Sequence, residues 1–280
     1  MSRFRPAWAL LALVPGSALL ANGCFDRPTS PAPIDSAVVL RLHEKLSASG
    51  RSLELLGRTE KIYGCSNFTI LYQQQSTGDA VSVRFVGIHM PDVCLTSLGP
   101  ATCTVPLGPT TIGSRLLMLG TTRGDVVTRL VVNADSIEVK GARGAGIALP
   151  APVLHRVPPG TIWGWIGWGP EDRSARAQAF LDSLTLVGAR PTRLLPGDYE
   201  YFQVDALGQV GLQGNYGFYF LKPYLFHFTG DTAALSGVVK AFGDPLWIAL
   251  YDDHGGTLYS WMLRGGAAPA LALARPPRKR

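Results

Sequence analysis

Between residues 36 and 139, apolar and polar positions alternate over short stretches, which is the pattern of strands that bury one face. In the first stretch, Val38, Leu40 and Leu42 fall on one face and charged side chains fall on the other. Eight such stretches are separated by turn residues, and they span 36–45, 52–63, 68–74, 80–89, 101–107, 114–119, 125–133 and 136–139. Short strands with regular turns predict an all-β sandwich or barrel over residues 36–141, and the length and turn spacing favour the sandwich.

The pattern changes after residue 141. Residues 142–160 contain four prolines and several glycines with little periodicity, so we expect a linker between two domains. Helical spacing of apolar residues then predicts one helix between Gly169 and Gly188 and a second between Asp231 and Gly243. Strands are predicted around these helices, at 161–168, 199–204, 216–228, 246–251 and 257–262.

The order of the later elements is β-α-β-β-α-β with an added strand. This order resembles that of ferredoxin-like domains, over residues 161–263. The resemblance implies an antiparallel sheet with both helices on one face. No cluster of cysteines accompanies it, so an iron–sulfur role does not carry over. The expected fold class is therefore α+β overall, a β-sandwich followed by a ferredoxin-like βαββαβ domain.

The first 24 residues have the layout of an export signal. Arg3 and Arg5 precede an apolar run over residues 7–20, and small residues then lead to Cys24. The end of this stretch, Leu-Leu-Ala-Asn-Gly-Cys, resembles the lipobox of bacterial lipoproteins, with Ala21 where the family usually has Leu. The resemblance implies that residues 1–23 are removed and that Cys24 is acylated and becomes the new N-terminus.

Two other fates of the apolar run stay open. A retained anchor would need roughly 20 apolar residues, and this run has about 14. Soluble secretion would need cleavage near Ala21 or Gly23 without lipid on Cys24. Residues 24–35 contain three prolines and predict a tether between membrane and body. In the lipoproteins that the signal resembles, Asp after the cysteine favours the inner membrane. Phe25 stands there, which favours the outer membrane.

The net charge of +6 belongs to the two ends of the chain. Without the two arginines before Cys24 and the four basic residues of the last six positions, residues 24–274 have no net charge. A neutral body argues against nucleic acid as a partner, because a nucleic-acid face needs clustered Lys and Arg. Residues 264–280 are expected to be a basic, disordered tail, and contact with anionic lipid head groups is the alternative.

Three cysteines remain after Cys24, and an exported chain enters an oxidising compartment where a disulfide is stable. Cys103 shares its alternation with apolar neighbours and is expected in the core, whereas Cys65 and Cys94 lie at the edges of strands. We therefore expect a Cys65–Cys94 disulfide, with Cys94–Cys103 as the alternative. Their spacing fits no zinc motif.

Aromatic side chains are concentrated beyond residue 160. Trp163 and Trp165 share one face of the 161–168 strand, while apolar residues also line its other face. Both faces of that sheet should therefore be covered. The two tryptophans either pack in a core or form a stacking surface for a glycan or an anchor for an envelope protein, which makes them the ligand-binding candidates.

Candidate chemistry is sparse. Asp252-Asp253-His254 is the one close carboxylate–histidine group, but the Gly-Gly that follows it is typical of a hairpin turn. The five histidines show no ligand spacing, so we expect no metal, no cofactor and no catalytic residue. The resulting hypothesis is a non-enzymatic envelope lipoprotein, held to the membrane by its lipid anchor, with a binding or scaffolding role. An envelope hydrolase whose site converges only in three dimensions is the alternative.

Overall fold

The computed structural model describes residues 31–141, 143–212 and 217–263, and these residues are mostly β-strand. Each of the eight strands predicted before residue 141 forms, within a few residues of its expected ends. They are β1 (Val38–Ser47), β2 (Gly50–Tyr63), β3 (Thr69–Thr77), β4 (Ala80–His89), β5 (Gly99–Pro109), β6 (Gly113–Thr121), β7 (Gly124–Val132) and β8 (Ser136–Lys140).

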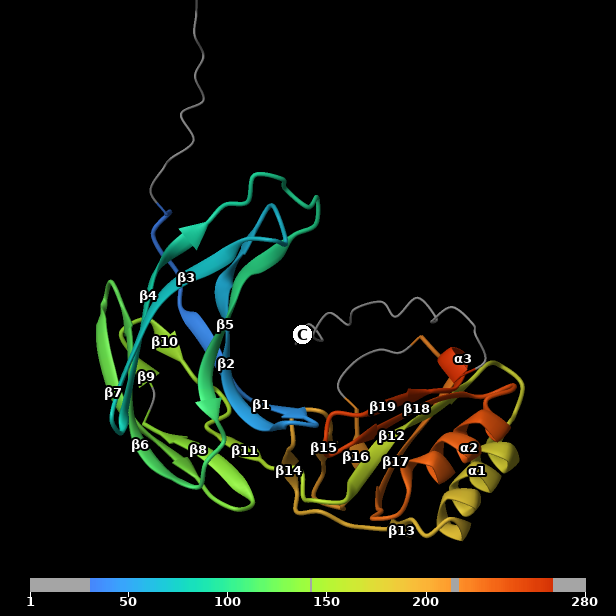
Figure 1. Ribbon diagram of the computed structural model, residues 1–280. Helices are drawn as coiled ribbons and strands as arrows, with labels where there is room; N and C mark the ends of the chain where they lie inside the picture. Colours follow the sequence, from blue (N-terminus) through green and yellow to red (C-terminus); the bar gives the residue numbers. More distant parts are fainter. Residues whose placement is uncertain (1–30, 142, 213–216, 264–280) are drawn as a thin grey trace, which may run out of the picture. The chain divides into compact units, whose positions relative to one another are not determined.

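These strands do not divide into the two sheets of a sandwich. They join in one curled sheet of eleven strands, in the order β11-β8-β7-β6-β4-β3-β5-β2-β1-β10-β9 (Figure 1). Its inner face encloses one apolar core, to which every strand except β9 contributes buried side chains. The sheet curls until the Thr121 hydroxyl, at the end of β6, donates a 2.5 Å hydrogen bond to the Ala145 carbonyl beyond β9. The sandwich prediction is wrong because alternation shows which face is buried but not which edges pair.

The stretch expected as a linker belongs to this sheet. It carries β9 (Arg143–Gly144), β10 (Ile147–Ala148) and β11 (Val153–His155). β10 pairs in parallel with β1, and β11 pairs antiparallel with β8. Short strands between prolines and glycines give too weak an alternation to recognise, which explains why the sequence indicated a linker.

Residues 31–35, expected to end the tether, also join the body. The backbone of Ala32 pairs with that of Ile88 on β4 through hydrogen bonds of 2.9 and 2.7 Å. Ile34 is buried in the first core. The described chain is therefore tied to β4 almost from its first residue.

A second sheet has five antiparallel strands in the order β13-β17-β12-β18-β19. They are β12 (Thr161–Trp168), β13 (Arg190–Pro191), β17 (Phe220–His227), β18 (Trp247–Asp252) and β19 (Thr257–Tyr259). The helices α1 (Ser174–Leu186) and α2 (Thr232–Phe242) cover one face, and α3 (Ser260–Leu263) ends the described chain. As predicted, Asp231 caps α2, its carboxylate accepting a 2.9 Å hydrogen bond from the Ala233 amide. No helix of the described segments is long and apolar enough to cross a bilayer.

The expected ferredoxin-like domain, and with it the α+β class, is wrong for this mostly β chain. The strand predicted at 199–204 is absent from the five-stranded sheet, where the two-residue β13 pairs with β17 instead. A separate small sheet takes its place, made of β14 (Gly197–Asp198), β15 (Gln203–Val204) and β16 (Val210–Gly211). The physical reason is that Tyr199 and Phe202 cover the second face of the larger sheet rather than extend its edge.

Candidate functional site

Trp163 and Trp165 lie on the face of β12 that turns away from α1 and α2. Their side chains are only 2% and 1% exposed. The Trp163 ring lies 5.5 Å from that of Phe202, and the Trp165 ring lies 5.2 Å from that of Phe218 and 5.9 Å from that of Trp261. Both residues are therefore core residues, and the stacking-surface alternative does not hold for them. The small sheet and α3 explain why aromatic residues occupy both faces of this strand.

The Asp252-Asp253-His254 group forms the hairpin turn between β18 and β19. The Asp252 carboxylate accepts hydrogen bonds from the amides of His254, at 2.9 Å, and Gly256, at 2.7 Å. Asp253 is buried and lies 3.7 Å from the Arg51 guanidinium. Within the described segments, no group of three or more His, Cys, Asp or Glu is arranged to hold a metal ion. The acidic side chains of this turn shape the turn and dock it against the first sheet.

The centre of that contact is Glu44, a carboxylate on the inward face of β1 that is 3% exposed. Arg156 holds it through two nitrogens, each 2.9 Å from the same carboxylate oxygen, and Arg51 lies 3.4 Å from the other oxygen. Arg51 also donates a 2.7 Å hydrogen bond to the Val157 carbonyl, and Arg156 donates one of 2.9 Å to the Asn133 carbonyl. We call Glu44, Arg51 and Arg156 the Glu44 clasp. It joins β1, β2 and the chain after β11.

Tyr201 connects the clasp to the aromatic core of the second sheet. Its hydroxyl donates a 2.9 Å hydrogen bond to the Glu44 carbonyl and accepts a 3.3 Å one from the Leu46 amide. Its ring lies 5.5 Å from that of Trp163. Burial raises the pKa of the Tyr201 hydroxyl, because the phenolate would lose its hydration. The hydroxyl therefore stays neutral and keeps both hydrogen bonds.

A second charged group lies beside the clasp, on the other face of β1. A buried Glu200 oxygen lies 2.6 Å from Nδ1 of His43, and its other oxygen lies 3.1 Å from the Arg41 guanidinium. Nε2 of His43 is 3.9 Å from the Glu54 carboxylate. Glu200 has a φ of 68°, a left-handed conformation that costs a non-glycine residue about 1–3 kcal/mol. The Asp198 carboxylate supports this turn by accepting a 2.7 Å hydrogen bond from the Glu200 amide. The partly exposed His43 ring therefore lies between two carboxylates.

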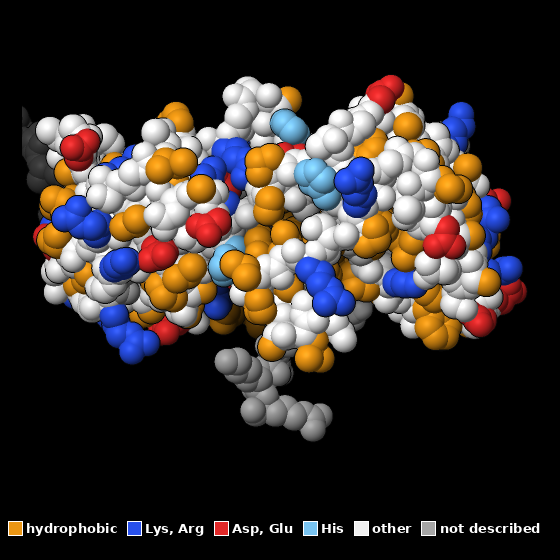
Figure 2. All heavy atoms as spheres, turned by 90° about the horizontal axis from the view of Figure 1, so that it is seen from below, with side chains coloured by type: hydrophobic (Ala, Val, Ile, Leu, Met, Phe, Trp, Pro, Cys, Tyr) orange, Lys and Arg blue, Asp and Glu red, His pale blue; other side chains and the backbone are white. Residues whose placement is uncertain are grey.

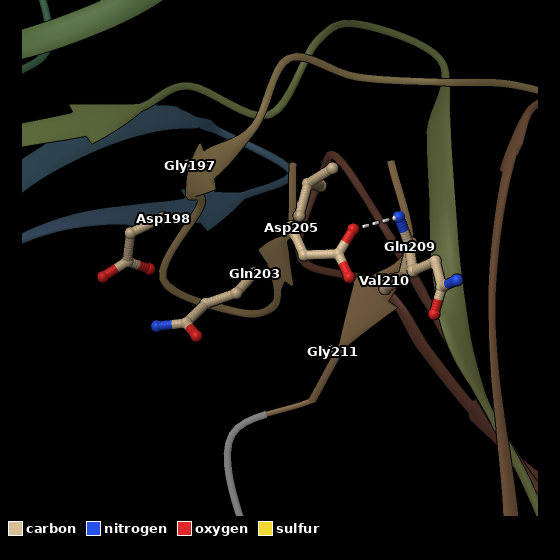
Figure 3. Close-up of a pocket in the computed structure, with 8 residues that line it drawn as sticks. Gly197, Asp198, Gln203, Asp205, Gln209, Val210 and Gly211 are labelled. Carbon is tan, nitrogen blue, oxygen red and sulfur yellow. Dashed lines mark hydrogen bonds between the residues drawn. The ribbon is translucent and has the colours of Figure 1, made fainter. Parts of the chain in front are cut away.

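An open cavity of about 480 Å³ lies on the small sheet. Figure 3 shows its polar side chains, and the Asp205 carboxylate turned toward Gln209. That carboxylate accepts hydrogen bonds from the amides of Leu207, at 2.9 Å, and Gln209, at 2.8 Å, so it also forms the turn between β15 and β16. The side chains of Asp198 and Gln203 add a carboxylate and an amide to the same cavity, which suits a ligand rich in hydroxyl groups.

A groove of similar volume, about 480 Å³, runs over β1, β2 and β5 beside Pro150 and Ala151. Its lining includes Cys103 and two arginines, Arg41 and Arg58. Burial raises the pKa of the Cys103 thiol to about 11, because the thiolate loses its hydration there. The thiol is therefore protonated at neutral pH and is a weak nucleophile.

No family model, curated protein or solved structure matches this chain. Cys24 and the basic tail, 264–280, lie outside the described residues.

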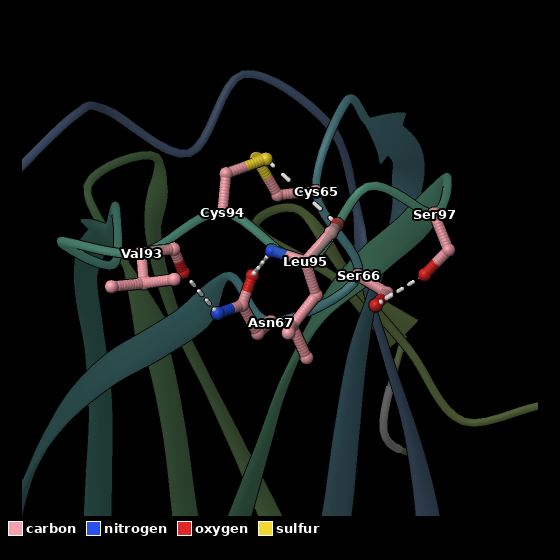
Figure 4. The surroundings of a disulfide bond; sticks show 7 residues. All are labelled: Cys65, Ser66, Asn67, Val93, Cys94, Leu95 and Ser97. Carbon is pink, nitrogen blue, oxygen red and sulfur yellow. Dashed lines mark hydrogen bonds between the residues drawn. A yellow bond between two sulfur atoms is a disulfide. The ribbon is translucent and has the colours of Figure 1, made fainter.

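The structure joins Cys65 to Cys94, the pairing expected from the sequence, and Cys103 takes part in no disulfide. Figure 4 shows Asn67 beside the disulfide, in contact with Val93 and Leu95 on either side of Cys94. Its side-chain amide donates a 2.7 Å hydrogen bond to the Val93 carbonyl and accepts a 3.2 Å one from the Leu95 amide. We call residues 90–98 the stapled loop.

Sequence reasoning missed the Glu44 clasp and the role of Asn67. Glu44 left a signal, since it is a charged residue at an inward position of β1, in step with Leu42 and Leu46. An acid at such a position needs a buried partner. One of its partners, Arg156, lies more than 100 positions away in the sequence, so alternation alone could not identify it. Asn67 left no signal beyond its place next to Cys65.

Proposed function

We propose that this protein is a lipid-anchored protein of the bacterial cell envelope with a binding or scaffolding role. The observation that carries the proposal is the basic, apolar and small-residue layout that ends in Cys24. The Cys65–Cys94 disulfide supports it, because disulfides persist in the oxidising compartments that exported proteins reach. Phe25 after the cysteine supports the outer membrane rather than the inner membrane as the site of anchoring.

A binding or scaffolding role is supported by the buried charged residues, which contact one another within the fold. Arg51 connects the two sheets, because it contacts Glu44 in the first sheet and Asp253 in the second. The open polar cavity on the small sheet offers a place for an envelope glycan, and an envelope protein is the other partner that we propose. On the face seen in Figure 2, basic and acidic side chains are interspersed, which supports a partner other than nucleic acid.

Metabolic labelling with a palmitate analogue tests the anchor. We expect the wild-type chain to be labelled and to sediment with outer membranes, and the Cys24→Ala variant to lose the label. A Cys103→Ala variant is the matched control, because that cysteine lies on β5, outside the signal stretch, and should not affect labelling. Unlabelled wild-type protein in the soluble fraction would refute the proposal.

An envelope hydrolase is the second candidate, and the contact between His43 and Glu200 favours it. A carboxylate 2.6 Å from one ring nitrogen can orient the imidazole so that the other nitrogen activates water. The test is hydrolysis of peptidoglycan fragments and model esters by the wild type and by Glu200→Gln. Hydrolysis that the variant loses while its circular dichroism is unchanged supports this candidate. Hydrolysis that the variant retains assigns the pair a structural role.

A further inference from the structure

The stapled loop displays large apolar side chains to solvent. Val93 and Leu98 are 73% and 70% exposed, and Met90 and Leu95 are exposed as well. Asp92 is the one charged residue among residues 90–98. Several large apolar side chains on one exposed loop mark an interaction surface, since single ones are common but clusters are not.

The loop is held in this exposed form from several sides. The disulfide fixes Cys94 to the end of β2, and Asn67 binds the backbone on both sides of it. The Ser97 hydroxyl also donates a 2.6 Å hydrogen bond to that of Ser66. A loop fixed in this way loses little conformational entropy when a surface covers it, which favours binding.

The loop lies next to the point where the chain enters the body. Ala32 pairs with Ile88, and Met90 begins the loop two residues later. Ala32 follows Cys24 by eight positions, and an extended chain spans at most about 3.5 Å per position. Bond geometry therefore keeps Cys24 within about 28 Å of the Ile88 end of β4. A lipid on Cys24 would hold this end of the sheet, and the loop with it, near the bilayer.

We propose that the stapled loop docks on the lipid bilayer and places Val93, Leu95 and Leu98 at the boundary between head groups and acyl chains. This proposal rests on the proposed lipid anchor, which brings the loop to the membrane. Apolar side chains at this depth add to the anchor, because their burial removes apolar surface from water. We choose the bilayer as the partner of the loop because Ala32, on the side of the chain that leads to Cys24, pairs with Ile88 just before the loop.

Quenching of tryptophan emission by brominated phosphatidylcholine tests the proposal. The full-length chain carrying Val93→Trp is purified from membranes and reconstituted in vesicles with and without bromine on the acyl chains. The matched control is Val127→Trp on β7, which replaces a valine that is 63% exposed. Val127 pairs with Met118, and Met118 with Ser82 on β4, so it lies six residues, or roughly 20 Å, along the strands from Ile88.

We expect bromine to remove much of the emission added by Val93→Trp and little of that added by Val127→Trp. Trp163, Trp165, Trp168 and Trp261 are buried and Trp247 is partly buried, so the emission of the unsubstituted chain in each vesicle type is subtracted as background. A second variant, Leu98→Trp, repeats the measurement if the first fails to fold by circular dichroism.

Equal emission from both vesicle types, with the protein still labelled at Cys24 and bound to membranes, would refute docking and leave the anchor in place. It would also favour a protein as the loop's partner. If the wild type is not labelled by palmitate, the proposed lipid anchor is refuted. Quenching of the same variants mixed with preformed vesicles then still tests whether the loop binds the bilayer. No quenching at residue 93 or 98 then refutes docking as well.

Discussion

Replacing Glu44 by Gln tests whether the two sheets are held together by the Glu44 clasp. The substitution keeps the shape of the side chain and removes its charge, so that the guanidinium groups of Arg51 and Arg156 lose their shared counter-charge. Breaking a buried ion pair from one side costs about 3–5 kcal/mol. Both arginines are partly exposed, and the Gln oxygen can still accept one hydrogen bond from Arg156. We therefore expect a loss of about 2–4 kcal/mol in the free energy of unfolding.

Urea unfolding measured by two probes suits this prediction. After Cys24, the tryptophans are Trp163, Trp165, Trp168, Trp247 and Trp261. Their emission therefore reports the second sheet, whereas circular dichroism reports the strands of both. Because the clasp and Asp253 connect the two sheets, we expect Glu44→Gln to lower the midpoint at both probes. A midpoint that moves only in circular dichroism would mean that the clasp stabilises the first sheet alone.

Glu138→Gln is the matched control. The Glu138 carboxylate lies 3.5 Å from the Lys140 ammonium at the surface of β8. An exposed ion pair is worth about 0–1 kcal/mol, because water and salt screen both charges. If Glu44→Gln costs no more than this control, the reasoning is refuted, and water rather than Glu44 compensates the two arginines.

Four further changes have expected outcomes. Gly164→Ala should cost several kcal/mol in urea unfolding, because its Cβ would overlap the Ala249 carbonyl oxygen, and wild-type stability would contradict the close packing of β12 on β18. Asp231→Ala should cost about 1 kcal/mol in the same assay through the lost helix cap, and no change would show that the cap is replaced. Cys94→Ser should lower the free energy of unfolding by about 3 kcal/mol and so lower the melting temperature. Reductant should lower the melting temperature of the wild type in the same way and leave that of the variant unchanged. The pKa of Cys103 is raised to about 11, so its alkylation in the native state should be slow at pH 8 and become faster toward pH 11. The stability that the protonated thiol contributes is present below about pH 9 and is lost between pH 9 and 11. Fast alkylation at pH 8 would refute its burial.

Much of the local structure could be predicted from the sequence. The alternation at Val38, Leu40 and Leu42 indicates a strand with one buried face, and the turn residues separate eight strands correctly. The edges that pair could not be predicted, because side-chain alternation is the same whether strands form two sheets or one. Residues 199–204 show a related limit, since Tyr199 and Phe202 are equally apolar in a strand and in a cover over another sheet.

The candidate sites could be predicted less well than the strands. The disulfide followed from the positions of three cysteines relative to strand edges, a local property of the sequence. The Glu44 clasp brings Arg51 and Arg156 together from positions that the fold alone makes adjacent. The solvent exposure of Val93 and Leu98 could not be predicted either, because the sequence of a loop is the same whether its apolar residues are buried or exposed.

The parallel pairing of β1 with β10 has a consequence for how the chain is made. Val38 pairs with Ile147, 109 residues later, so the outer edge of β1 has no partner until most of the first sheet has been produced. A chain that is exported from its N-terminus would expose the unpaired backbone groups of this strand edge during transit. Open edges recruit other strands, and contacts so distant in sequence form slowly. We therefore expect the emerging chain to bind a holding chaperone until β10 closes that edge.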